Sequence, residues 1–136
     1  MPINKHHILY IEDHEDTREL VTLVLRQRDF EVTSCTTIEN GVKLACENSF
    51  DLYLLDSWLP DGSGLDLCRR IREFDGFTPI LFYSAAAYEV DKELALKCGA
   101  QGYLTKPTQN SELCDLVSSL IDSSSRVERT AMARHR

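Results

Sequence analysis

The chain has 136 residues, of which 43% are hydrophobic and 27% are charged, a composition typical of a globular domain with an ordinary core. Residues 1–122 carry 11 basic and 21 acidic side chains, a net charge of −10, so this part lacks the basic surface that nucleic-acid binding requires. Its longest apolar runs, of about four or five residues, are far shorter than the about 20 residues of a membrane-spanning helix, and its N-terminus does not resemble a signal peptide, so we expect a cytoplasmic protein.

Apolar runs alternate with amphipathic segments along the chain, and turn residues separate them. Asp16 and Glu19 form a capping box at the start of the first amphipathic segment, and the last such segment has the clearest helical period. In chain order we predict a strand at 7–11, a helix at 16–28, a strand at 30–35, a helix at 38–48, a strand at 51–55, a helix at 65–74, a strand at 79–83, a helix at 88–98, a strand at 102–105 and a helix at 110–122.

This alternation is typical of consecutive β-α-β units, which form a parallel sheet with helices on both faces. The length fits the doubly wound, five-stranded order 2-1-3-4-5. We therefore predict an α/β three-layer sandwich. Five cysteines without a C-x-x-C pair are predicted to be small buried side chains in a reducing compartment: Cys35, Cys46, Cys68, Cys98 and Cys114.

Polar residues follow four of the predicted strands, at the edge where their carboxyl ends meet. Glu12 and Asp13 follow the first strand, Asp56 the third, Ser84 the fourth and Lys106 the fifth. Three carboxylates that converge repel one another unless protons or a cation neutralise them. A hard divalent cation such as Mg²⁺ suits such an all-oxygen site when a phosphate completes its ligands.

A carboxylate held by a cation and a lysine can attack phosphorus and form an aspartyl phosphate, so Asp56 is the candidate nucleophile, assisted by Lys106 and Ser84. Each residue alone has an ordinary alternative: Asp56 as a helix cap, Glu12 and Asp13 as the polar start of a loop, Ser84 as a common serine after a strand, and Lys106 as a surface lysine. Their joint arrival at adjacent strand ends favours the site.

The chain resembles the receiver domain of bacterial two-component response regulators over about residues 6–122. The segments that carry the resemblance are Ile11-Glu12-Asp13, Leu55-Asp56-Ser57-Trp58-Leu59-Pro60-Asp61-Gly62-Ser63-Gly64, Ser84, and Gly99-Ala100-Gln101-Gly102-Tyr103-Leu104-Thr105-Lys106-Pro107. The resemblance implies a flavodoxin-like fold and a phosphoacceptor that receives its phosphoryl group from a histidine kinase or a histidine phosphotransfer protein.

The resemblance also implies the role of each site residue. Asp56 would be the phosphoacceptor, Asp13 a direct Mg²⁺ ligand and Glu12 an assisting one that acts through water. The backbone carbonyl of Trp58 would be a further metal ligand, and Lys106 would contact the phosphoryl group. Mn²⁺ would serve in place of Mg²⁺.

A switch is implied as well. Ser84 would move toward the phosphoryl group and Tyr103 would swing inward, changing the face made by the fourth helix, the fifth strand and the fifth helix. The bond between Lys106 and Pro107 is expected to be cis. The alternative for Tyr103 is a static, half-buried strand aromatic.

Glu12 has a longer arm than the aspartate commoner in the family, and His14 is expected to be a solvated loop residue. Trp58 is either an exposed loop aromatic or a shield that slows loss of the phosphoryl group.

Two rival functions are a phosphorylation-independent interaction module of the same fold and a Mg²⁺-dependent phosphohydrolase with an aspartyl nucleophile. The first would lack one of the acidic residues or the lysine, and the second needs a carboxylate two residues after its nucleophile, where this chain has Trp58. A nucleotide carrier is disfavoured because no glycine-rich loop follows the first strand. We therefore expect a signalling phosphoacceptor and no classical enzyme, with only limited self-phosphorylation and self-dephosphorylation.

Residues 123–136 carry four arginines and one glutamate and show no apolar period, so we predict a flexible basic tail or the start of a linker. The output is then either a downstream protein target or an output domain on the same polypeptide. We expect a monomer or a phosphorylation-dependent dimer, with no membrane or nucleic-acid contact by this domain.

Overall fold

The computed structural model describes residues 5–134, and the side chains of residues 5–124. Its elements alternate along the chain as predicted, with one additional pair of short strands. They are β1 (His7–Ile11), α1 (Glu15–Gln27), β2 (Glu31–Cys35), α2 (Ile38–Glu47), β3 (Leu52–Leu55), β4 (Trp58–Leu59), β5 (Gly62–Ser63), α3 (Gly64–Arg72), β6 (Ile80–Ser84), α4 (Glu89–Lys97), β7 (Gly102–Thr105) and α5 (Asn110–Arg134).

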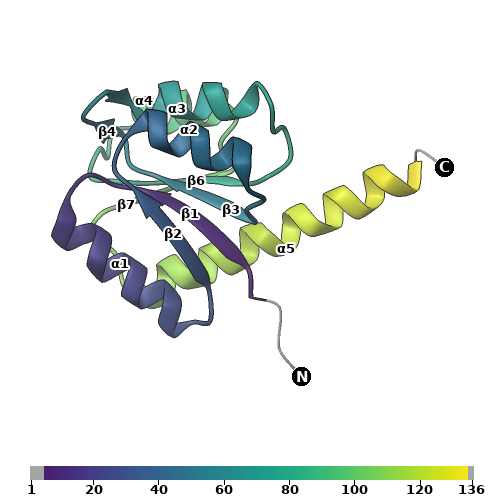
Figure 1. Ribbon diagram of the computed structural model, residues 1–136, viewed down its shortest axis with the longest axis horizontal. Helices are drawn as coiled ribbons and strands as arrows, with labels where there is room; N and C mark the ends of the chain where they lie inside the picture. Colours follow the sequence, from purple (N-terminus) through teal and green to yellow (C-terminus); the bar gives the residue numbers. More distant parts are fainter. Residues whose placement is uncertain (1–4, 135–136) are drawn as a thin grey trace.

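Five strands form one sheet in the order β2-β1-β3-β6-β7, and every neighbouring pair in it is parallel. This is the predicted order, so the prediction of a doubly wound α/β sheet is confirmed. The central strands β1, β3 and β6 are almost wholly buried, which explains why they are continuous apolar runs in the sequence. Their carboxyl ends meet at one edge of the sheet (Figure 1).

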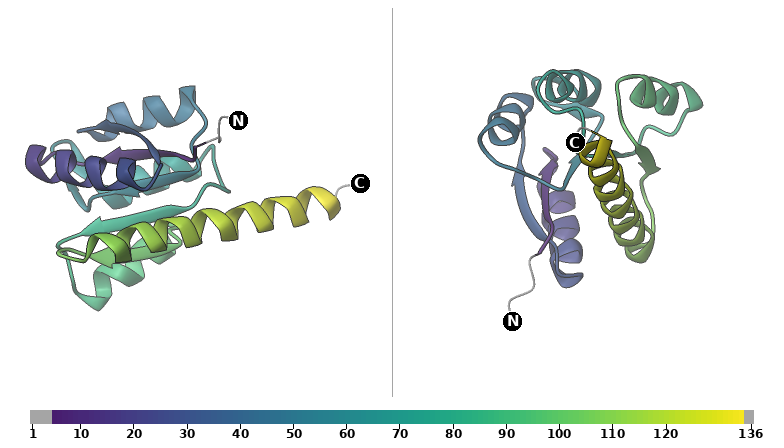
Figure 2. Two further views of the ribbon diagram at one scale, coloured as in Figure 1. Left: turned by 90° about the horizontal axis from the view of Figure 1, so that it is seen from below. Right: turned by 90° about the vertical axis from the view of Figure 1, so that its right-hand side faces the viewer.

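Helices cover both faces of the sheet (Figure 2). On one face, α1 and α5 pack their apolar sides against β1 and β3, with Val24 and Val117 among the buried contacts. On the other face, α2, α3 and α4 cover the sheet, with Leu67 and Ala95 buried. The sheet is thereby held between two apolar layers, and the polar residues after its strands are left at the open edge.

The structure corrects several predicted boundaries. α1 begins at Glu15, because His14 and not Asp16 is its N-cap: the His14 ring accepts a hydrogen bond from the Thr17 backbone N–H. His14 is exposed in the loop before α1, as predicted, and its ring also caps that helix. α5 extends to Arg134, so its predicted end at residue 122 was wrong (Figure 1). The last two residues of the predicted tail, 135–136, lie outside the described residues.

The cysteine prediction holds for two residues only. Cys68 and Cys114 are buried, Cys35 and Cys98 are half-buried, and Cys46 is exposed on the outer side of α2. Within the described residues, no helix is both long enough and apolar enough to span a bilayer.

Candidate functional site

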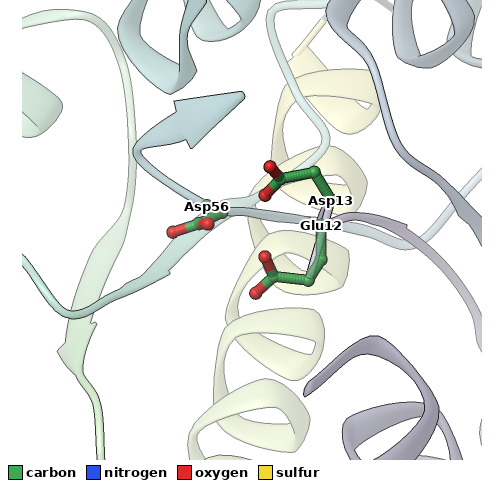
Figure 3. Close-up of side chains that lie close together, drawn as sticks. All are labelled: Glu12, Asp13 and Asp56. Atoms are coloured by element: carbon green, nitrogen blue, oxygen red, sulfur yellow. The ribbon is translucent and has the colours of Figure 1, made fainter. Parts of the chain in front are cut away.

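Three carboxylates meet where β1 and β3 end. Glu12 and Asp13 follow β1, Asp56 follows β3, and oxygen atoms of all three lie within 4.8 Å of one another. Figure 3 shows Glu12 and Asp13 beside Asp56 at this edge. The predicted convergence is confirmed, and it follows from the parallel pairing of β1 with β3, which aligns Ile11 with Leu55.

Lys106 joins this cluster from the loop after β7. Its Nζ lies 2.5 Å from Glu12 Oε1 and 3.8 Å from Asp56 Oδ1, so the lysine pairs with Glu12 more closely than with the candidate nucleophile. Nζ also lies 5.4 Å from the centre of the Tyr83 ring. The peptide bond that follows, Lys106–Pro107, is cis as expected.

The pKa values of Asp56 and Glu12 are shifted in opposite directions. Burial, reinforced by the neighbouring Glu12, raises the pKa of Asp56 to about 6, although Lys106 opposes the rise. Burial pushes the pKa of Glu12 up, but hydrogen bonds from Lys106 and Asp56 outweigh it, so the net pKa of Glu12 is lowered. Glu12 is the ionised partner of Lys106, and Asp56 is the carboxylate that most needs an additional cation.

Tyr10 lies beneath this cluster. Its hydroxyl is buried and lies 3.4 Å from Glu12 Oε1, and burial together with the charges of Glu12 and Asp56 raises the pKa of the phenol. The tyrosine therefore stays a neutral donor. Sequence analysis missed it, because a tyrosine inside an apolar strand has no feature that marks it as a neighbour of the site.

Ser84 and Tyr103 meet at one backbone residue. The Ser84 Oγ accepts a hydrogen bond from the Ala86 N–H at 3.1 Å, and the Tyr103 hydroxyl donates to the Ala86 carbonyl at 2.6 Å. Tyr103 stacks on Phe82 at a ring distance of 5.8 Å and lies 3.4 Å from the Ser57 hydroxyl. Tyr103 is therefore half-buried and inward in this structure, and Ala86 connects it to Ser84.

The loop after Asp56 folds into a small hairpin that the sequence did not reveal. β4 and β5 pair antiparallel, and the Ser57 N–H donates to Asp56 Oδ1 at 2.8 Å. Asp61 in the turn accepts hydrogen bonds from the N–H groups of Ile38 and Glu39, at the start of α2. The hairpin is thereby fixed to α2, with the Trp58 side chain 70% exposed on its surface.

The donor set at this edge suits a hard cation. All three converging side chains are carboxylates, and the charge on Asp56 is disfavoured without a neutralising partner. Oxygen-only sites with few carboxylates favour Mg²⁺ or Mn²⁺ over zinc or copper. The residues present therefore fit a divalent cation beside Asp56.

Comparison with known proteins agrees with this geometry. The family model described as response regulator receiver domain matches residues 8–118. The chain is 37% identical over 111 residues to the transcriptional regulatory protein YkoG of Bacillus subtilis, which covers 82% of this chain and 49% of that protein. It spans about half the length of the curated relatives it matches, from 45% to 51%.

Solved structures give the same result. The non-phosphorylated HemR receiver domain of Leptospira biflexa matches with a TM-score of 0.80 and 32% identity, covering 86% of this chain and 94% of that one. A CheY-like receiver domain protein of Methanospirillum hungatei has a TM-score of 0.86 over 90% of this chain and 98% of that one, at 21% identity, and supports the fold alone.

Proposed function

The chain belongs to the response regulator receiver domain family, and from this premise we propose that it accepts a phosphoryl group from a phosphohistidine on a partner protein, with Asp56 as the acceptor. The observation that carries the proposal is the close approach of Glu12, Asp13 and Lys106 to Asp56 at the strand ends. We further propose that Asp13, Asp56 and the Trp58 carbonyl hold Mg²⁺ or Mn²⁺, with Glu12 assisting. The cation would neutralise charge on the transferring phosphoryl group.

The transfer breaks the P–N bond of the phosphohistidine and forms a bond between phosphorus and a carboxylate oxygen of Asp56. The hydrogen bond from the Ser57 N–H fixes Oδ1, so the carboxylate meets phosphorus in one orientation. Near neutral pH Asp56 is ionised, since its pKa of about 6 lies below the ambient pH, and no proton has to be removed. The histidine imidazole is the leaving group.

Lys106 exchanges partners in this proposal. Before transfer its ammonium group pairs with Glu12, and Asp56 is 3.8 Å away, so a small shift of Nζ brings it to a phosphoryl oxygen on Asp56. Glu12 holds the lysine near Asp56 without a direct hydrogen bond between the lysine and the nucleophile. Lys106 then stabilises the charge that develops on the transferred group.

The signal leaves through Ser84 and Tyr103. If the Ser84 hydroxyl turns to a phosphoryl oxygen, its contact with the Ala86 N–H is exchanged or strained, and the Ala86 carbonyl, which Tyr103 binds, moves with it. The inward Tyr103 described here is the position that phosphorylation would favour. Phosphorylation thus biases the face made by α4, β7 and α5 only as far as it contacts the two conformations differently.

A groove beside the site supports docking of a phosphodonor protein. It has a volume of about 370 Å³ between α1 and the loop after β7, and Leu20, Pro107 and Lys106 are among its lining residues. Leu20 is 58% exposed. A kinase or phosphotransfer protein seated on this apolar surface would bring its phosphohistidine to the strand ends.

The output and the setting are also proposals. The relatives are transcriptional regulatory proteins of about twice this length, so we propose that the signal reaches a DNA-binding output domain or a separate protein target. We propose a receiver domain at 6–122, a basic tail or the start of a linker at 123–136, a cytoplasmic location, and either a monomer or a phosphorylation-dependent dimer. The acidic domain itself binds no nucleic acid and no membrane.

Incubation with Mg²⁺ and a small phosphodonor such as acetyl phosphate tests the proposal. Mass spectrometry should find one added phosphoryl group in the wild type and in the control Asp66→Asn, an exposed carboxylate paired with Arg69, but none in Asp56→Asn. A phosphoryl group retained in Asp56→Asn would overturn the assignment. No added mass in the wild type would favour the phosphorylation-independent interaction module.

A further inference from the structure

Arg18 projects from the second turn of α1 back to the loop that carries the acidic residues. Its Nη1 donates hydrogen bonds to the backbone carbonyls of Glu12, at 3.1 Å, and Asp13, at 3.4 Å. Among the residues whose side chains the structure describes, no carboxylate lies within ion-pair distance of this guanidinium. Arg18 therefore holds two consecutive carbonyls and no acidic side chain.

The loop that Arg18 contacts carries two carboxylates that lie close to a third, that of Asp56. Glu12 is 1% exposed, Asp13 is exposed, and both must turn toward Asp56 from adjacent backbone positions. Repulsion among the three carboxylates pushes this loop away from β3 whenever no cation is bound. A donor shared by the carbonyls of residues 12 and 13 fixes both peptide planes and so fixes where the two side chains start.

We infer that Arg18 is a positioning residue for the divalent cation, holding Glu12 and Asp13 in the arrangement that binds it. This inference rests on the cation site of the proposed function. Arg18 touches neither the cation nor the phosphoryl group and acts only through the backbone of the loop. Outer-shell partners of this kind typically change metal affinity by about 10–100-fold.

The sign of the effect separates this role from simple electrostatics. A positive charge near a cation site weakens cation binding, so loss of the Arg18 charge alone would tighten binding. Loss of the two hydrogen bonds from Arg18 to the carbonyls of Glu12 and Asp13 acts the other way, because the loop must then be ordered when the cation binds. The positioning role therefore predicts weaker cation binding after removal of Arg18, although a positive charge has been lost.

Arg26 provides a matched control two helical turns along α1. Its Nη2 donates to the Val32 carbonyl at 3.2 Å, so it also bonds to backbone, but at β2 and away from the acidic loop. Arg26→Met removes the same charge from the same helix without touching residues 12 and 13. Arg18→Lys keeps the charge but replaces the planar guanidinium with a single ammonium group.

Calorimetric titration with MgCl₂ alone measures the affinity of each variant. We expect about tenfold weaker binding in Arg18→Met, an intermediate loss in Arg18→Lys, and wild-type affinity in Arg26→Met. Urea unfolding without Mg²⁺ shows which variants are folded. Should Arg18→Met fail to fold, Arg18→Lys decides: weaker binding supports the inference and wild-type affinity overturns it.

Two results overturn the inference in distinguishable ways. Unchanged or tighter Mg²⁺ binding in folded Arg18→Met overturns it alone and leaves phosphoryl transfer to Asp56 standing. Absence of Mg²⁺ binding in the wild type overturns it together with the Mg²⁺-dependent function from which it starts.

Discussion

Asp56→Asn should stabilise the Mg²⁺-free protein at neutral pH. The pKa of Asp56 is raised from 3.8 to about 6, first by burial and second by Glu12, so the folded protein resists ionising this carboxyl. At about 1.36 kcal/mol for each unit of pKa, this rise makes the folded protein with Asp56 ionised less stable by up to about 3 kcal/mol. Asparagine is neutral, keeps an acceptor for the Ser57 N–H, and is free of this penalty.

The pH dependence has a definite sign. Because the folded pKa lies above the unfolded one, the unfolded state loses its proton first, and the wild type loses stability as pH rises from about 4 to about 6. At about pH 3, well below the unfolded pKa of 3.8, the carboxyl is mostly protonated in both states, so the stabilities of wild type and variant should converge there. Above about pH 6 the difference should be constant at about 2–3 kcal/mol.

Urea unfolding of both proteins at several pH values, with and without Mg²⁺, provides the measurement. Mg²⁺ at about 100 times its dissociation constant should add about 2.7 kcal/mol to the wild type, which narrows or removes the advantage of Asp56→Asn. Asp66→Asn is the control and should change stability by less than about 1 kcal/mol, because its ion pair with Arg69 is exposed. A variant no more stable than wild type at pH 7, or an equally large difference in stability at about pH 3, would refute the reasoning.

Three further substitutions test the surroundings of the site. Lys106→Met leaves the buried carboxylate of Glu12 without its cation, so urea unfolding should show a loss of about 3 kcal/mol; a loss near zero would contradict the ion pair. Gly64→Ala should prevent stable folding, since a Cβ there would overlap the backbone oxygen of Asp56. Gly76→Ala should fold normally, because nothing lies within 4 Å of its Cβ position; circular dichroism compares the two variants, and equal stability would contradict the prediction. Trp58→Ala should shorten the lifetime of the phosphorylated protein if the exposed indole shields the phosphoryl group, and an unchanged or longer lifetime, followed by mass spectrometry, would end that idea.

The central sheet and the acidic cluster could be predicted because both depend on local signals. A parallel strand buried on both faces is a short apolar run, and it ends where its first charged residue appears. Glu12, Asp13 and Asp56 mark those ends directly, so the strand order alone brings them together.

Features that depend on partners distant in sequence could not be predicted. The β4–β5 hairpin is held by Asp61, whose partners Ile38 and Glu39 belong to a different helix, and two-residue strands have no apolar period. The closer pairing of Lys106 with Glu12 than with Asp56 depends on where the three side chains lie in the folded cluster.

The predicted start of α1 and the predicted end of α5 were wrong for different reasons. His14 caps α1 through a ring nitrogen, although Asp16 is the commoner capping residue type and had the capping-box spacing. α5 continues to Arg134 without an apolar period, and the periodicity used to predict helices cannot detect a segment that has none.

The packing of α4 indicates how a local change beside Asp56 can reach a surface. Only Ala95 of this helix is buried, while Val90 and Leu96 are more than half exposed, so few apolar contacts hold α4 in place. Elements with few buried contacts belong to the low-stability part of a fold and move at small cost. Ala86, bonded to Ser84 by its N–H and to Tyr103 by its carbonyl, lies three residues before the first residue of α4. A shift at Ala86 would therefore act on a helix that a single buried residue, Ala95, anchors to the core.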